Sequence, residues 1–101
     1  MNTNEALEFE ALYQQDPAVV SRQIAGETIL VPIRHNAADL ESIYMLNETA
    51  ASAWALVDGQ RTLGEIRDAI ATQYDVSREE AGHDLAELVA RLEALGALVR
   101  R

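Results

Sequence analysis

The sequence predicts an α+β domain of winged-helix-like type, in which a three-stranded antiparallel meander is followed by a three-helix bundle. Two observations indicate this class. Short β-branched and aliphatic runs alternate with turn residues between positions 19 and 46, whereas apolar residues recur at helical spacing from position 47 onward. The length, 101 residues, is that of one domain with a single core.

Three strands are expected in the first region, at residues 19–24, 29–33 and 43–46. Ala25-Gly26 supplies a glycine where the first hairpin must turn, and the polar residues 35–39 connect to the third strand. Pro32 has no N–H to donate, so we expect it at the end of the second strand or at a bulge. The third strand has an open edge, with no proline or charge between positions 43 and 46 to protect it.

Three helices are expected next, each with its own start signal. Asn47 caps the first, which ends at Asp58-Gly59, while capping boxes begin at Thr62 and Ser77. Gly96 stops the third helix, and residues 97–99 return as a short extended tail. The predicted inner faces are Ala50, Ala53, Trp54 and Val57 for the first helix, Leu63, Ile66, Ile70 and Tyr74 for the second, and Ala81, Leu85, Leu88, Leu92 and Leu95 for the third.

The acidic N-terminal segment is predicted to be a separate part of the chain. Apolar residues within positions 1–16 recur near helical spacing, so we expect a short helix there, closed by Pro17. The predicted organisation is an N-terminal arm at 1–17 and a winged-helix-like domain at 18–101. The arm is either a docking element or a mobile tail.

Composition excludes several classes of function. Eight basic residues against 17 acids give a formal charge of −9, which disfavours nucleic acid and anionic lipid as partners. The absence of cysteine excludes disulfides and thiolate-held metals. His35 and His83 have no companion at ligand spacing, so no metal or cofactor is expected. The acidic start and the lack of a long apolar run predict a soluble cytoplasmic protein rather than a membrane protein.

The third helix has a flank of small residues between its buried and charged stripes. Gly82, Ala86 and Val89 lie on this flank, at the shoulder of the core-facing stripe. Such residues allow another chain to approach the helix backbone, so the flank can form one wall of a shallow groove. Packing at the edge of the core is the alternative explanation.

Several local phrases occur in a recognisable order from the third strand to the C-terminus. They are residues 44–51, Trp54, residues 58–62, Glu65-Ile66, residues 74–76, Asp84 and residues 95–98. As an ordered set this stretch resembles the PqqD-like family, small winged-helix peptide chaperones that are also called precursor-peptide recognition elements.

The resemblance implies a specific function. Family members bind the leader of a precursor peptide as a strand added along the third strand and packed on the third helix, and they present it to a modifying enzyme. That enzyme is a radical-SAM protein in the pyrroloquinoline quinone pathway. On this chain the implied peptide-binding positions are Ser42, Ile43, Tyr44, Met45 and Leu46 on the strand, and Gly82, Leu85, Ala86 and Val89 on the helix. No catalytic residue is implied, and quinone and lasso-type products both remain open.

Two other functions compete with this interpretation. The open strand can pair with its own copy, which would give a strand-exchanged homodimer instead of a monomer. The winged-helix outline also suggests DNA binding, but two arginines stand against five acids between positions 77 and 95. A DNA-reading helix requires the opposite balance of charge.

Overall fold

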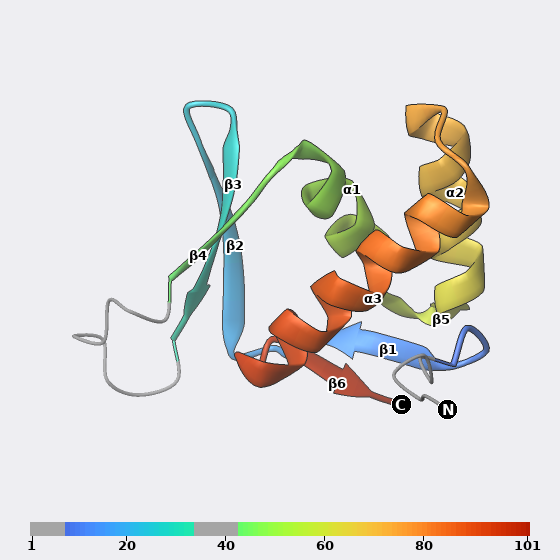
Figure 1. Cartoon of the computed structure of the whole chain (residues 1–101). Coiled ribbons are helices and arrows are strands. Elements are labelled where there is room, and N and C mark those ends of the chain that lie inside the picture. Colours follow the sequence, from blue (N-terminus) through green and yellow to red (C-terminus); the bar gives the residue numbers. More distant parts are fainter. Residues whose placement is uncertain (1–7, 34–42) are drawn as a thin grey trace.

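The structure, a computed structural model, describes residues 8–33 and 43–101 and confirms the α+β class (Figure 1). Within these residues, two three-stranded antiparallel sheets accompany three helices. In chain order the elements are β1 (Leu12–Gln15), β2 (Val19–Ile24), β3 (Glu27–Pro32), β4 (Tyr44–Leu46), α1 (Glu48–Leu56), β5 (Asp58–Thr62), α2 (Leu63–Tyr74), α3 (Arg78–Ala94) and β6 (Leu98–Arg100).

The predicted meander is the sheet with strand order β2-β3-β4. Its hairpin turns at Ala25 and Gly26, whose φ angles of 54° and 83° are those of a two-residue type I′ turn. Pro32 ends β3, as predicted from its missing N–H. The polar connection predicted at residues 35–39 lies outside the described residues.

The second sheet, in the order β5-β1-β6, contains two strands that the sequence did not predict. Residues 12–15 form the central strand β1, so the helix expected within residues 1–16 is wrong for this segment. Residues 58–62 form β5 rather than only a helix stop and a cap. Both strands depend on pairing between distant segments, which local propensity does not report. The extended tail predicted at residues 97–99 is confirmed, because residues 98 and 99 belong to β6 and residue 97 directly precedes that strand.

The three helices begin where the capping residues predict. The Asn47 side chain accepts a hydrogen bond from Ala50 N at 2.8 Å, and Thr62 and Glu65 form a complete capping box. Ser77 Oγ accepts from Glu80 N at 3.0 Å. At the end of α3, Gly96 has a φ of 76°, and Ala97 N donates to Leu92 O at 2.8 Å, as in a glycine C-cap.

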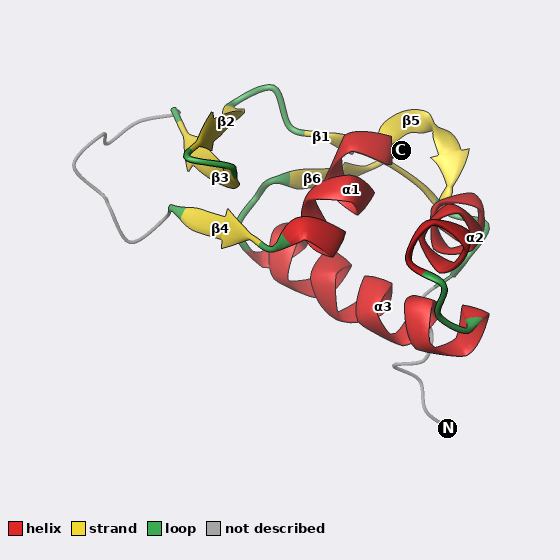
Figure 2. Ribbon diagram, turned by 90° about the horizontal axis from the view of Figure 1, so that it is seen from above, coloured by secondary structure: helices red, strands yellow, loops and turns green. Residues whose placement is uncertain are grey.

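The core joins the three helices to the inner face of the meander. Trp54 on α1 is buried, as predicted, and Leu30, Leu63, Ile66 and Leu92 are the largest side chains that are almost wholly enclosed. Figure 2 shows α1 and α3 on one side of the β2–β3–β4 sheet. The core therefore lies between that face and the helices, and the β5–β1–β6 sheet adds Tyr13 and Leu98 to it.

The buried stripe of α3 is rotated from the predicted one. Leu88 and Leu95, predicted inside, are only partly buried and pack against the edge of the core. Gly82 and Val89, predicted on the flank, are buried. Phe9 packs over Gly82 from the N-terminal segment, and Val89 joins the buried core cluster that includes Tyr13 and Leu98.

Candidate functional site

Strand β4 is an edge strand, because it follows β3 at the end of the order β2-β3-β4. The hairpin fixes which of its backbone groups face outward. In a two-residue hairpin the residues flanking the turn, Ile24 and Glu27, exchange backbone hydrogen bonds. Bonded and non-bonded pairs then alternate, so Thr28 and Leu30 direct their backbone groups toward β4 instead of β2.

Thr28 and Leu30 pair with Leu46 and Tyr44 respectively, whereas Met45 lies between these two bonded pairs. The N–H and C=O of Met45 therefore point to the free edge of the sheet. The same alternation requires Ile33 N to face β2, and it donates to Ala18 O at 2.7 Å. Among the described residues, Met45 is thus the centre of an unpaired stretch of backbone.

Beside this edge, a cavity of about 450 Å³ lies between β4 and α3. Its walls come from β4, from one flank of α3 and from the facing sides of α1 and α2, and the lining residues include Tyr44, Met45, Ala50, Ala53, Ile70, Leu85 and Leu88. Arg91 and Asp84 stand at the rim. Arg91 Nη1 donates to Tyr44 Oη at 3.4 Å, and this hydrogen bond raises the pKa of the guanidinium.

The predicted strand positions lie at this edge in two alternating sets. Ile43 and Met45 point outward, with 41% and 56% of their surface exposed. Leu46 is buried and Tyr44 is half-buried, because both face the helices. Ser42 lies outside the described residues.

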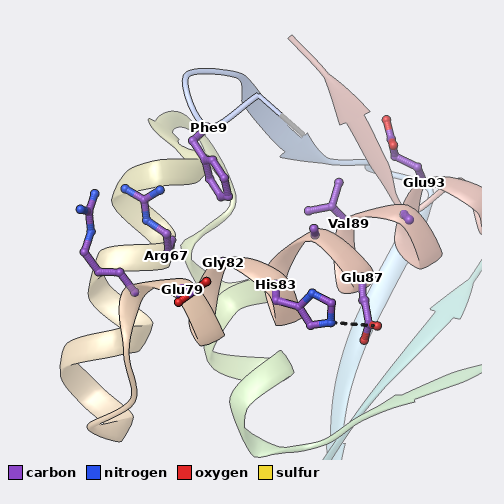
Figure 3. Close-up of a pocket in the computed structure, with 11 residues that line it drawn as sticks. Phe9, Arg67, Glu79, Gly82, His83, Glu87, Val89 and Glu93 are labelled. Atoms are coloured by element: carbon purple, nitrogen blue, oxygen red, sulfur yellow. Dashed lines mark ion pairs between the residues drawn. The ribbon is translucent and has the colours of Figure 1, made fainter. Parts of the chain in front are cut away.

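The predicted helix positions are divided between two grooves. Leu85 lines the cavity beside β4, but Gly82, Ala86 and Val89 line a second groove on the opposite flank of α3 (Figure 3). The sequence expected all four beside β4. The absence of a side chain at Gly82 instead accommodates Phe9, because a Cβ atom added at Gly82 would lie 3.2 Å from Phe9 Cζ.

The second groove has a volume of about 940 Å³ and lies on the side of α3 that carries Phe9 from the N-terminal segment. Phe9 lies over it, and the Arg67 guanidinium stacks 4.5 Å from the centre of the Phe9 ring. Val89 forms part of its wall and is only 2% exposed. His83 Nε2 lies 3.5 Å from Glu87 Oε2 on the exposed rim (Figure 3).

Five further residues of α3 line this cavity without having been predicted as binding positions: Ala81, Asp84, Glu87, Leu88 and Arg91. The helical pattern places Ala81 and Leu88 on the predicted core-facing stripe and the other three on the charged stripe that faces water. A usable signal was present, since a leucine lies between opposite charges three and four residues away on one helical face. That pattern is also common on ordinary surface helices.

Residues capable of metal chemistry do not gather in the described part of the chain, where no group of three His, Asp or Glu side chains is placed to hold an ion. The chain contains no cysteine. No helix among the described residues is long and apolar enough to span a membrane. The arrangement offers backbone hydrogen bonds and a cavity lined by both apolar and charged side chains, which are means of binding.

Comparisons with solved structures show the same fold. TbiB1 in complex with the TbiA(beta) leader peptide matches with a TM-score of 0.69 and 26% identity, over 84% of this chain and 93% of that one. A lasso peptide synthetase B1 complexed with the leader peptide matches with a TM-score of 0.71 and 22% identity, over 86% and 96%.

A third match is the solution structure of the PqqD truncation of Methylobacterium extorquens PqqCD, described as a stand-alone recognition element for ribosomally synthesised, modified peptides. Its TM-score is 0.73 at 20% identity, over 96% of this chain and 98% of that one. No curated protein matches the chain. The model of coenzyme PQQ synthesis protein D matches residues 27–98, and this chain therefore belongs to the PqqD family.

Proposed function

We propose that this protein is a non-catalytic recognition element. It binds the leader of a ribosomally made precursor peptide as a strand added to β4, and it presents the peptide to a modifying enzyme. The observation that carries the proposal is the unpaired backbone of Met45 beside the cavity between β4 and α3. The leader-bound TbiB1 structure, at 26% identity, supports the same role.

The register of the meander predicts how the leader docks. A leader residue opposite Met45 takes the backbone hydrogen bonds at the free edge, and its side chain lies beside that of Met45. The leader residues on either side of it face inward, next to Tyr44 and Leu46. Because the cavity there is lined by Leu85 and Leu88, apolar side chains are favoured at these two positions.

The expected affinity is moderate. Each backbone hydrogen bond contributes about 0.5 to 1.5 kcal/mol net, and ordering a flexible peptide offsets part of that gain. Addition of one short strand and one or two buried side chains is consistent with a dissociation constant near micromolar, about −8 kcal/mol. Such binding suffices for a carrier that raises the local concentration of the leader at an enzyme.

Backbone pairing at Met45 is tested by Met45→Pro, which removes the outward N–H but none of the ladder bonds to β3. The measurement is titration with the leader of a precursor peptide encoded beside this gene, followed by NMR amide shifts. Met45→Pro should weaken binding roughly tenfold or more. The matched control Met45→Ala keeps the N–H and should bind within about threefold of the parent protein. Equal binding by both variants would contradict strand addition at β4.

The side of α3 that holds the leader is tested by a second matched pair. Leu88→Glu places a charge in the β4-side cavity, and Ala86→Glu places the same charge on the Phe9 flank. We expect only Leu88→Glu to abolish leader binding. The reverse result would return the site to the flank of Gly82, Ala86 and Val89.

The enzyme partner completes the proposal. A radical-SAM protein is the partner implied by membership of the PqqD family. The two leader-bound relatives are TbiB1, bound to the TbiA(beta) leader, and a lasso peptide synthetase B1, so their names refer to other peptides. The cytoplasm is the proposed compartment, because ribosomally made precursors originate there. Pull-down of the precursor together with the modifying enzyme, with and without this protein, tests the presenting role.

A further inference from the structure

The outer face of the β2–β3–β4 sheet is apolar and uncovered by any described element. Along β3, Thr28 and Leu30 are buried toward the helices, so Ile29 and Val31 point the other way. Met45 on β4 pairs with Ile29 and shares that outer face. Figure 2 shows the helices on the opposite side of the sheet only.

This face collects most of the exposed large hydrophobic residues. In the described part of the chain there are five, and four of them, Ile24, Ile33, Ile43 and Met45, belong to this sheet or to the residue just beyond a strand. They are 56%, 62%, 41% and 56% exposed. The fifth, Val99, lies on β6 in the other sheet. A cluster of this kind on one face marks an interaction surface rather than scattered surface residues.

The charges on this face indicate what covers it. The chain carries −9, so two copies repel each other over most orientations. Arg22 on β2 and Glu27 on β3 are the two charged residues on the outer face, and they cancel. Neither has an ion-pair partner among the described residues. A second copy can therefore approach this face with little net repulsion.

The two charges are also self-complementary. In a two-fold arrangement the same patch is used by both copies, so a contact made by one residue with a second is repeated in reverse. Arg22 of one copy can then face Glu27 of the other, and Glu27 can face Arg22, around the apolar residues between them. The buried aliphatic side chains supply the attraction, and the two ion pairs fix the register.

We propose that a second copy of this chain covers the outer face of the β2–β3–β4 sheet, forming a two-fold dimer held by aliphatic packing and reciprocal Arg22–Glu27 pairs. The dimer leaves the free edge of β4 open in both copies. It therefore differs from strand exchange through β4, which would occupy the edge where the leader is proposed to bind. The inference does not depend on leader binding, because it uses the face and not the edge.

The test is the molar mass of the full chain by sedimentation velocity, from low to high micromolar concentration. A dimer is expected, and Ile24→Asp and Ile33→Asp should each weaken it roughly tenfold or more. Both positions are exposed, so the fold should be retained, which circular dichroism checks. The matched control Val99→Asp changes an exposed hydrophobic residue on β6 and should leave the dimer unchanged.

Charge reversal tests the pairing itself. Arg22→Glu should weaken the dimer roughly tenfold by placing like charges together, and Arg22→Glu with Glu27→Arg should restore it. Failure of the double variant to restore association would overturn the reciprocal pairs.

Three other outcomes would overturn the dimer. One is a monomer at all concentrations. A second is a dimer that resists the face variants but is lost with Met45→Pro, which would assign association to the β4 edge. The third is a monomer whose binding to the modifying enzyme is lost with Ile24→Asp, which would assign the face to that enzyme. Leader titration of the same variants reports the proposed function separately.

Discussion

The two flanks of α3 have different neighbours. On one flank, Phe9 from the chain's own N-terminal segment lies over Gly82, and Val89 is buried in the core. On the other, Leu85 and Leu88 border a cavity that ends at the unpaired edge of β4. Small residues on a helix thus indicate that something approaches closely, but they do not indicate whether it is the same chain or a guest.

The largest expected effect distinguishes the flanks by burial. Val89→Asp places a carboxylate at a position that is 2% exposed and should destabilise the protein by more than about 3 kcal/mol. Leu88→Asp, at a partly exposed position, should cost about 1 to 2 kcal/mol. Urea denaturation of both variants measures the difference. Similar midpoints would contradict the difference in burial between Val89 and Leu88.

Removal of Phe9 is the next test. Phe9→Ala deletes the ring that packs on Gly82 and stacks with Arg67, and for a partly exposed phenylalanine we expect a loss of about 1 to 3 kcal/mol. Thermal unfolding measures the stability. Leader affinity should not change, since the β4 side keeps its residues. A loss of affinity without further unfolding would show that the two flanks are coupled.

A smaller effect comes from Gly82→Ala. Alanine favours a helix interior by about 1 kcal/mol over glycine, but the new Cβ would meet Phe9 Cζ at 3.2 Å and Arg67 Cδ at 3.3 Å. In the parent protein these opposing effects should nearly cancel. In the Phe9→Ala background the same substitution should stabilise by about 0.5 to 1 kcal/mol. Equal effects in both backgrounds would rule out the proposed contact with the ring.

The smallest expected effect is the contribution of Asp68 to the pH dependence of stability. Hydrogen bonds from Arg67 and Arg78 hold the pKa of Asp68 below its ordinary value of 3.8. A lowered pKa in the folded state adds stability above the ordinary value, and this stability is lost as the pH falls through the folded pKa. Unfolding should therefore become easier below about pH 4, and Asp68→Asn should flatten that slope. An unchanged slope in the variant would exclude Asp68 as its source.

Local signals predicted a large part of the fold. Ala25-Gly26 fixed the hairpin, and the caps at Asn47, Thr62 and Ser77 placed the three helix starts within a residue. Each of these signals acts through hydrogen bonds or backbone angles between neighbours in the sequence. A single sequence is therefore sufficient to predict this hairpin turn and these helix starts.

The second sheet could not be predicted in the same way. β1 has the sequence Leu-Tyr-Gln-Gln and β5 has Asp-Gly-Gln-Arg-Thr, and neither resembles a typical strand. They form because β1 pairs with β5 and β6, which are far away in the sequence. The same long-range packing places Phe9 on the flank of α3 that was expected to bind the leader. The cavity beside β4 is instead lined by the opposite flank, with Leu85 and Leu88.

The pairing of β1 with β6 affects how the protein can be attached to other molecules. Tyr13 stands opposite Arg100, and Arg101 N donates to Leu12 O at 2.8 Å. A tether joined after Arg101 therefore starts from the β5–β1–β6 sheet, while Met45 belongs to the other one. Immobilisation or fusion through that end therefore attaches the protein by the sheet that does not contain the proposed peptide-binding strand.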